Sequence, residues 1–228
     1  MKPLEILFQD EFLVAIDKPA GMLVHPVREP ESREHIAMKR LHDQLGRYVF
    51  PVHRLDRPTS GVLLFALDKK TAGLAQQIFE QRQITKIYHA IVCGSTPRRW
   101  ICETPLAASM ESELLAARTS FERLAKTQES TFPGNPGLIL SLLEVTPTTG
   151  RFHQIRRHLL EAGFPIAGDF RYGGEETSHA LGEILGTGSR MLLQSKALDF
   201  RHPRTGESLR IEAPPDVDFK LCHLAGIA

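Results

Sequence analysis

Short apolar runs separated by turn-forming residues set the pattern of this chain. Residues 4–16, LEILFQDEFLVAI, contain two such runs around a polar Gln-Asp-Glu step, which predicts a β-hairpin or a bent pair of strands. Residues 62–67, VLLFAL, are apolar at every position and predict a buried strand. Residues 86–94, KIYHAIVCG, and 138–147, LILSLLEVTP, predict two further strands.

Helical spacing appears in three segments between these strands. In residues 27–47, Ile36, Leu41 and Leu45 predict a helix in the second half, ending at Gly46, after a loop in the first half. KKTAGLAQQIFEQRQI, from residue 69, predicts an amphipathic helix that buries Leu74, Ile78 and Phe79. TGRFHQIRRHLLEAG, residues 149–163, predicts a helix entered through a Thr-Gly turn and closed by its last glycine.

The remaining segments complete an α+β pattern. Residues 95–137 are rich in Ser, Thr, Pro and Glu, and there only TSFERLAKT predicts a strand and TFPGNPG a turn. In the tail, RMLLQSKALDF and SLRIEAP predict strands, and GDFRYGG and HPRTGE predict turns. The fold class predicted is α+β, a mixed, largely antiparallel β-sheet with flanking helices.

Composition narrows the class of protein. The 228 residues, 42% hydrophobic and 24% charged, are typical of one globular domain or of two small ones that share a sheet. The three cysteines, Cys93, Cys102 and Cys222, form no CxxC pair, which favours a reducing cytoplasm over a disulfide framework or a zinc site. No run approaches the roughly 18 apolar residues that a membrane span needs, and the N-terminal stretch lacks the uninterrupted apolar region of a signal peptide.

Charge points to a local basic surface. The formal net charge is only +1, so a nucleic-acid partner would have to be held by a cluster of basic residues. Basic residues do gather around the predicted elements, in a distribution that suits a phosphate-rich partner. They are Lys69, Lys70, Arg82, Lys86, Arg98, Arg99, Arg151, Arg156, Arg157 and Arg171.

The stretch before the buried strand, VHRLDRPTSG, is the first candidate for chemistry. Asp56 stands between Arg54 and Arg57, and His53, Thr59 and Ser60 add further polar groups. An aspartate that caps a turn is the structural alternative, but so many polar groups at the end of an apolar strand indicate the floor of a site. A Ser-His-Asp triad using Ser60 has no GxSxG elbow to support it, and a retaining glycosidase would need a second carboxylate.

Two further segments carry candidate residues. In HQIRRH, His153 and His158 are five residues apart, so on a helix they cannot face one metal ion. Arg151, Arg156 and Arg157 are better explained as contacts to an anion near a helix N-terminus, with a solvated basic face as the alternative. Tyr88 is either a half-buried strand tyrosine or a platform on which a base stacks.

Taken together, these segments resemble the RluA-type pseudouridine synthases. HRLDRPTSGVLLFAL resembles the catalytic-aspartate motif of that family, and four more stretches resemble its other motifs in the family's order. These are DKPAGMLVHP, KIYHAIVCG, TGRFHQIRRHL with GFPIAGDFRYG, and RMLLQSKALDFRHPRTGE. Within the family, HRLDRPTSGVLL and the QDE opening are most similar to members that act on a uridine in the tRNA acceptor arm.

The resemblance implies an isomerase that flips a uridine out of RNA, breaks its C1′–N1 bond, turns the base and rejoins it through C5. Asp56 would be the nucleophile, and attack on ribose C1′, attack on base C6 and removal of the C2′ proton are its alternative actions. Arg156 would pair with it and keep it charged, and Tyr88 would stack on the base. Arg54 would fill the gap left by the flipped base. The implied substrate-binding residues are His53, Arg54, Arg57, Thr59, Arg151, Gln154 and Leu192. No cofactor or metal is expected, because the isomerisation exchanges no electrons and needs no activated water.

The resemblance also sets expectations about organisation. It implies one catalytic domain over residues 1–228 without an S4 domain, because only sixteen residues precede Asp17. We expect a cytoplasmic monomer acting on tRNA, with ribosomal RNA as the alternative substrate. A non-catalytic RNA-binding module and a nucleoside or glycoside hydrolase using Asp56 remain competing hypotheses. One departure is Gln194, which stands where the family usually has a histidine and puts a substrate or packing contact in doubt.

Overall fold

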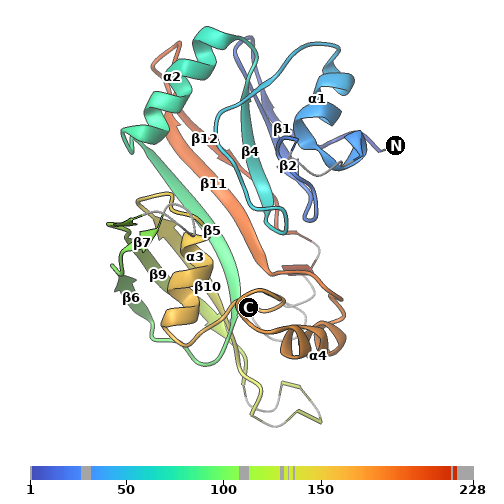
Figure 1. Ribbon diagram of the computed structural model, residues 1–228, viewed down its shortest axis with the longest axis vertical. Helices are drawn as coiled ribbons and strands as arrows, with labels where there is room; N and C mark the ends of the chain where they lie inside the picture. Colours follow the sequence, from blue (N-terminus) through green and yellow to red (C-terminus); the bar gives the residue numbers. More distant parts are fainter. Residues whose placement is uncertain are drawn as a thin grey trace. The chain divides into compact units, whose positions relative to one another are not determined.

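A computed structural model describes residues 2–26, 32–107, 113–128, 131–132, 134–135, 137–216 and 218–219. Its elements follow one another as strands interrupted by four α-helices and a 3-10 helix (Figure 1). The helices are the 3-10 helix Arg33–His35, α1 (Ala37–Leu45), α2 (Lys69–Glu80), α3 (Gln154–Glu161) and α4 (Glu175–Leu185). The strands are β1 (Ile6–Gln9), β2 (Leu13–Lys18), β3 (Phe50–Pro51), β4 (Ser60–Ala66), β5 (Ile84–Cys93), β6 (Arg99–Cys102), β7 (Leu106–Ala107), β8 (Leu114–Leu115), β9 (Thr119–Lys126), β10 (Leu140–Pro147), β11 (Leu193–Arg201) and β12 (Ser208–Glu212).

The chain forms two compact units. The first contains residues 1–86 and 194–214, and the second contains residues 87–193 and 215–228. Strands β5 and β11 each begin in one unit and continue in the other. Most of the strand pairs are antiparallel, and the predicted α+β class with a mixed, largely antiparallel sheet is confirmed.

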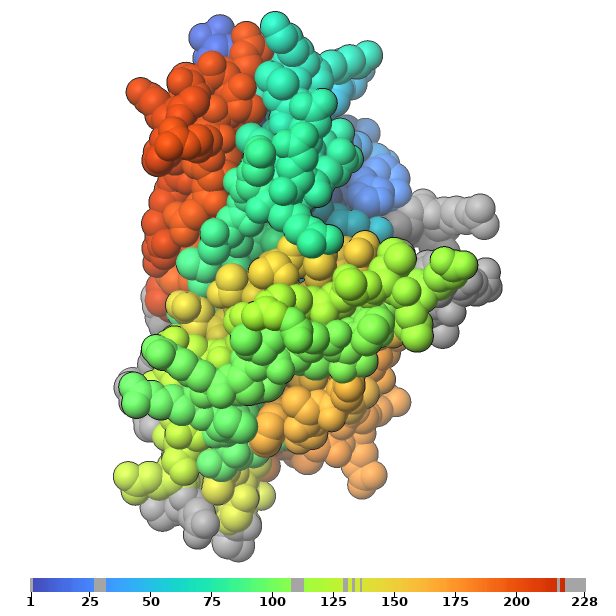
Figure 2. All heavy atoms as spheres, turned by 90° about the vertical axis from the view of Figure 1, so that its left-hand side faces the viewer, coloured from blue at the N-terminus to red at the C-terminus, as the bar shows by residue number. Residues whose placement is uncertain are grey.

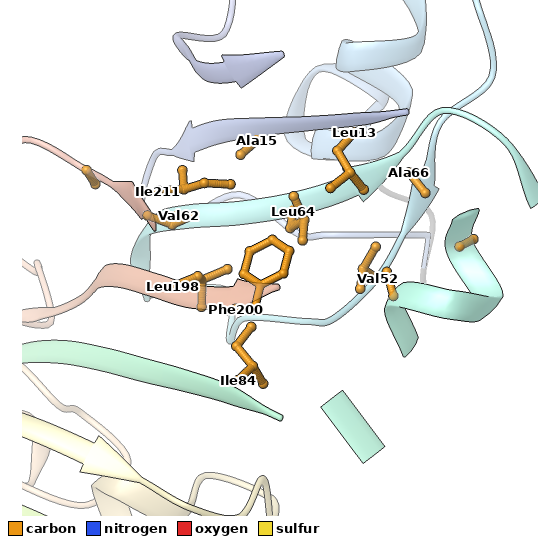
Figure 3. Close-up of a cluster of buried hydrophobic side chains, with 13 residues drawn as sticks. Leu13, Ala15, Val52, Val62, Leu64, Ala66, Ile84, Leu198, Phe200 and Ile211 are labelled. Atoms are coloured by element: carbon orange, nitrogen blue, oxygen red, sulfur yellow. The ribbon is translucent and has the colours of Figure 1, made fainter. Parts of the chain in front are cut away.

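The sheet of the first unit has the order β1-β2-β4-β11, with β12 added on β11 and β3 on β4. All seven residues of β4 are buried, as its unbroken apolar run predicts. Side chains from these strands meet those of α2 in one hydrophobic cluster, in which Leu13, Leu64 and Phe200 converge (Figure 3). This cluster supports the strand that follows the Asp56 segment.

Gly61 allows β4 and β11 to run in parallel at close approach. Its φ is +99°, and a Cβ atom built on it would lie 2.1 Å from the carbonyl oxygen of Ser195. Only glycine tolerates both conditions, so the glycine of the PTSG turn is required by the packing of these two strands. The position lies five residues after Asp56 and fixes where the Asp56 loop ends.

The sheet of the second unit has the order β5-β10-β9-β6, all antiparallel. Helix α3 lies on the face formed by β10 and β9 (Figure 1), where Ile155 and Leu159 enter a cluster with Phe121 and Val145. On the face shown in Figure 2 the green segment that contains β6 lies at the surface, whereas Leu106 and Ala107 of β7 are buried. The sequence predicted neither of these two strands.

Several predicted boundaries differ from the structure. Helix α2 ends at Glu80 instead of residue 84, and Arg82 has a φ of +58°. It buries Thr71, Ala72 and Ala75, whereas the predicted Leu74, Ile78 and Phe79 are only partly buried. Small residues face the sheet there because the helix packs close to it.

Other expectations hold in part. The predicted helix in the second half of residues 27–47 is α1, whose C-cap is Gly46 in the left-handed conformation. The predicted loop before it falls partly on residues 27–31, which lie outside the described residues. The TFPGNPG turn includes residues 133 and 136, also outside them, and the Asn135 N–H donates to the Phe132 carbonyl as a turn requires. No helix in the described part of the chain is long and apolar enough to cross a membrane.

Candidate active site

Asp56 lies in the loop that connects β3 to β4 in the first unit. The loop turns at Asp56, whose carbonyl oxygen accepts from the Thr59 N–H at 3.0 Å. The Asp56 side chain is half-buried, and Thr59 is buried against the start of β4. The loop therefore ends on a buried strand, which fixes the backbone that carries the carboxylate.

A buried lysine that the sequence did not single out is hydrogen-bonded to this loop. Lys18 ends β2 and has no exposed surface. Its Nζ donates to the carbonyl oxygens of Pro19 (3.0 Å), Met22 (2.8 Å) and Arg57 (3.2 Å). A buried ammonium is tolerated only when its N–H groups are satisfied, so the three carbonyls and Lys18 order one another.

Arg57 strengthens the same connection. The Nε–H group of Arg57 donates to the Gly21 carbonyl at 2.9 Å, and the Arg57 carbonyl accepts from the Gly21 N–H at 2.8 Å. The DKPAG segment and the RLDRP segment are therefore joined by reciprocal bonds. Two motifs that lie about forty residues apart in the sequence are therefore in direct contact. Arg54 is exposed on the other side of Asp56 in the sequence.

His53 has a structural contact that its predicted role in substrate binding did not include. Its Nε2 accepts from the Leu64 N–H at 3.1 Å, and its ring stacks on Phe79 of α2 at 4.8 Å between centroids. Burial, together with the nearby Lys86 charge, lowers the pKa of His53 to about 3. The imidazole is therefore neutral near pH 7 and ties the start of the loop to β4.

Lys86 adds a partly desolvated charge next to this histidine. Burial, together with the Arg82 charge, lowers the pKa of Lys86 to about 8. The ammonium stays largely protonated at neutral pH, so it contributes positive charge beside the loop that carries Asp56.

Tyr88 lies on β5, where it is paired with Val145 of β10 in the second unit. The side chain is half-buried and packs against the hydrophobic cluster of that unit. This is the environment of a strand tyrosine with a partly exposed ring. Its stacking on a base stays a prediction.

The start of α3 differs from the expectation. The helix begins at Gln154, because His153 adopts the left-handed conformation with φ 51° and ψ 33°. Arg151 precedes the helix, and its Nε and one Nη donate to the Ala116 carbonyl at 3.3 Å. The predicted turn at Thr149 is held by a bond from its hydroxyl to Gln154 Oε1 at 2.6 Å.

The side chain of Gln154 makes four hydrogen bonds within its unit. Oε1 accepts from the Thr149 hydroxyl and the Arg151 N–H, and Nε2 donates to the Arg118 carbonyl and the Thr119 hydroxyl. These bonds use the amide's donors and acceptors. The predicted substrate-binding residue therefore anchors the loop before α3 to β9.

Arg156 has a partner that no sequence pattern indicated. Its Nε donates to Asp169 Oδ2 at 2.7 Å and its Nη2 to Oδ1 at 2.8 Å, with side chains only 6% and 1% exposed. Asp169 Oδ1 also accepts from the N–H groups of Arg171 and Tyr172. The GDFRYG stretch, interpreted only as a turn, thus supplies the counter-ion, and pairing of Arg156 with Asp56 stays a prediction.

The neighbouring Arg157 is not buried with Arg156. Its Nη1 lies within hydrogen-bonding distance of the carbonyls of Ala107 (3.3 Å) and Phe152 (3.4 Å). The two consecutive arginines therefore point to different surroundings. Only Arg156 is held in a bidentate ion pair.

Leu192 occupies a packing position. Its side chain is fully buried in a cluster with Ile91, Ala167 and Leu181, and its backbone bonds to Ile91 and Ala167. Its predicted contact with the substrate stays a prediction, and the side chain has no exposed surface in this structure. Gln194, where the sequence departs from the family, is buried as well and donates from Nε2 to the Pro214 carbonyl at 2.7 Å.

The two histidines of HQIRRH have separate surroundings. His158 is buried between the Thr119 hydroxyl (2.8 Å) and the Thr104 carbonyl (3.0 Å), and burial lowers its pKa. His153 contacts Tyr172 instead. Among the described residues, no group of three or more His, Cys, Asp or Glu side chains could hold a metal ion.

The comparisons with known proteins decide the family. The family described as RNA pseudouridylate synthase matches residues 12–161, which include Lys18, Asp56, Tyr88 and Arg156. The chain belongs to the RNA pseudouridylate synthase family. The predicted family and the predicted isomerase class are thereby confirmed.

Similar curated proteins cover nearly the whole chain. A protein of Haemophilus ducreyi named tRNA pseudouridine synthase C is 39% identical to this chain. The match covers 96% of this chain and 93% of the length of that protein. Proteins of the same name from Vibrio parahaemolyticus and Haemophilus influenzae are 40% and 41% identical, covering 93% of this chain in each case and 91% and 93% of their own.

Solved structures show the same fold. Human RNA Pseudouridylate Synthase Domain Containing 4 is 25% identical with a TM-score of 0.74, covering 98% of this chain and 94% of its own. Human RNA Pseudouridylate Synthase Domain Containing 1 is 22% identical with a TM-score of 0.73, covering 100% and 98%. The latter likeness concerns the fold alone.

Proposed function

We propose that this enzyme isomerises a specific uridine of tRNA, in the acceptor arm, to pseudouridine. The observation that carries the proposal is the 39–41% identity, over nearly the whole chain, to relatives named tRNA pseudouridine synthase C. The basic residues of the chain suit the phosphates of an RNA, although phosphate contacts orient an RNA without reading its sequence.

Asp56 is the proposed nucleophile of the reaction. Its loop is ordered by Lys18 and Arg57 and ends on a buried strand, as a reacting group requires when it must be held in one geometry. In the proposed reaction the C1′–N1 bond breaks, the base turns, and a C1′–C5 bond forms while the C5 proton leaves and N1 takes up a proton. Arg156 keeps the carboxylate charged, Tyr88 stacks on the base, and Arg54 occupies the gap in the RNA.

The experiment that tests the proposal measures tritium release from uridine labelled at C5. Bulk tRNA and ribosomal RNA are assayed separately with the wild-type enzyme, Asp56→Asn and the control Asp43→Asn. Asp43 lies on α1 and pairs with Arg33 at the surface, so its loss leaves the reaction unchanged. RNA binding is measured on the same three proteins by filter retention.

We expect release from tRNA that Asp56→Asn eliminates while RNA binding is retained. Turnover that persists in Asp56→Asn contradicts the role of Asp56. Release only from ribosomal RNA retains the chemistry and overturns the substrate. Binding without release indicates a non-catalytic module, and free uracil indicates a hydrolase.

We also infer that the enzyme acts as a cytoplasmic monomer and that residues 1–228 work as one catalytic domain. The absence of CxxC pairs in the sequence fits a reducing compartment. Light scattering coupled to size exclusion tests the oligomeric state: a mass near 25.5 kDa supports a monomer, and twice that value contradicts it.

A further inference from the structure

The ring of Tyr172 lies over the guanidinium of Arg156. The Arg156 Cζ atom is 4.9 Å from the ring centroid, a distance at which a cation is attracted to the face of an aromatic ring. Asp169 holds the same guanidinium from its edge through two short hydrogen bonds. Arg156 is therefore held by the ion pair with Asp169 and by the contact of its Cζ atom with the face of the Tyr172 ring.

Tyr172 is in turn held by residues on both sides. Its N–H donates to Asp169 Oδ1 at 3.2 Å, and its hydroxyl lies 3.1 Å from His153 Nδ1. The His153 ring meets the tyrosine ring edge-on, with an interplanar angle of 90°. Asp169, Arg156, Tyr172 and His153 form a continuous chain of contacts within the second unit.

His153 adopts a left-handed backbone conformation, which is unfavourable for residues that have a Cβ atom. Its φ of 51° makes it one of two non-glycine residues with positive φ in the described part of the chain. Such a conformation costs about 1 kcal/mol or more, and it persists where the surroundings determine it. The strained turn brings the imidazole to the Tyr172 hydroxyl, immediately before the helix that carries Arg156.

We propose that Tyr172 is a positioning residue that orients the guanidinium of Arg156 for the isomerisation. The ion pair with Asp169 uses Nε and Nη2, which places Nη1 on the side opposite Asp169. Asp169 alone permits the guanidinium to tilt about the line of the two hydrogen bonds. The Tyr172 ring opposes that tilt and so fixes the direction of Nη1. The inference rests on the proposed function, because Arg156 is a proposed catalytic residue.

Removal of the Tyr172 ring has different kinetic effects if the ring contacts the substrate and if it positions Arg156. A ring that stacked on an RNA base would contribute to binding, so its removal would raise KM. A ring that acts through Arg156 would leave KM nearly unchanged and lower kcat. Its removal would also have little effect once Arg156 itself is altered, because residues that act as a unit are not additive.

The test uses tritium release from C5-labelled tRNA with Tyr172→Leu, Tyr172→Phe, Arg156→Lys and the double variant Tyr172→Leu/Arg156→Lys. Tyr48→Leu is the matched control, because Tyr48 is an exposed tyrosine on the first unit. Thermal melting accompanies each assay, so that a variant that fails to fold is recognised. Tyr172→Phe keeps the ring and loses only the hydroxyl, and so it tests the ring in a folded protein.

We expect Tyr172→Leu to lower kcat by at least about 10-fold with KM within about 3-fold, because small misplacements of a catalytic group have large effects. Tyr172→Phe should restore most of kcat. In the Arg156→Lys background, which keeps the charge but loses the bidentate fork, Tyr172→Leu should cost less than about 2-fold more.

Three results would overturn the inference while leaving the proposed function intact. They are a wild-type kcat in Tyr172→Leu, a rise in KM alone, and full additivity with Arg156→Lys. If Tyr172→Leu does not fold, a kcat for Tyr172→Phe as low as that of Arg156→Lys overturns it, because the ring is still present. Absence of release by the wild-type enzyme would instead contradict the proposed function.

Discussion

Arg156 and Asp169 form a bidentate ion pair with distances of 2.7 and 2.8 Å and almost no exposure to solvent. The guanidinium lies on the first helical turn of α3, and the carboxylate lies in the turn that follows Gly168. A buried charge without its partner is strongly destabilising. The pair therefore connects the stability of the second unit with the orientation of a proposed catalytic group.

Asp169→Asn should destabilise the protein by about 3 kcal/mol, because Arg156 stays buried without a full counter-charge. The amide oxygen can still accept from the backbone N–H groups, so the loss reports on the ion pair. The matched control is Asp199→Asn, whose partner Arg210 is 52% exposed and whose loss should change stability by less than about 1 kcal/mol. Urea unfolding measures both values, and equal effects of the two substitutions would contradict the prediction.

Lys18→Met should loosen the Asp56 loop without removing apolar volume. Three carbonyl groups lose a donor, and each buried acceptor left unsatisfied costs about 1–3 kcal/mol. We expect a clear drop in melting temperature together with a lower kcat for tritium release. Lys2→Met, at an exposed position of the first unit and outside the basic cluster, serves as the control. Unchanged kcat in a destabilised Lys18→Met protein would show that the lysine supports the fold but not the loop geometry.

Gly61→Ala should be among the most disruptive single substitutions in the first unit. The new Cβ would meet the Ser195 carbonyl at 2.1 Å in a backbone conformation that alanine rarely adopts. Gly73→Ala is its counterpart, because Gly73 lies on α2 with nothing within 4 Å of a Cβ. That change should stabilise the protein by about 0.5–1 kcal/mol. Thermal melts of the two variants should therefore shift in opposite directions.

The stability of the protein should fall as the pH drops below about 6.5, partly because of His53. The folded-state pKa of His53 is lowered to about 3, so below pH 6.5 the unfolded chain binds a proton that the folded chain does not. The folded state is disfavoured progressively between pH 6.5 and 3, by up to about 1.4 kcal/mol per pH unit. His158, whose pKa is also lowered, acts in the same direction.

His53→Gln isolates the contribution of the first histidine. Glutamine offers an acceptor for the Leu64 N–H but does not titrate. Between pH 7 and 5 its free energy of unfolding should therefore decline less steeply than that of the wild type, by about 2 kcal/mol over the interval. Parallel pH dependences of the two proteins would show that His53 is not buried in its neutral form.

The sequence by itself determined the strands with unbroken apolar runs, the α+β class and the family. Such segments can be recognised locally, because a short run that is apolar at every position and follows turn residues, like VLLFAL, is typical of a strand buried on both faces. The five motifs in order identified the chemistry through Asp56, Tyr88 and Arg156, whose catalytic roles stay predictions. Gly46 as the end of α1 is a local feature of the same kind.

Only the tertiary structure decided which residues support those groups. Lys18 contacts the carbonyl of Arg57 across 39 positions, and Asp169 reaches Arg156 across 13. A lysine near the N-terminus and an aspartate in a turn give no local signal of a buried partner. The hydrophobic pattern shows which side of a helix or strand is buried, but it does not show which distant residue a side chain contacts. The short strands β6, β7 and β8 were missed because they are defined by backbone pairing and not by the pattern of their own side chains: β6 pairs with β9, and β7 and β8 pair with each other.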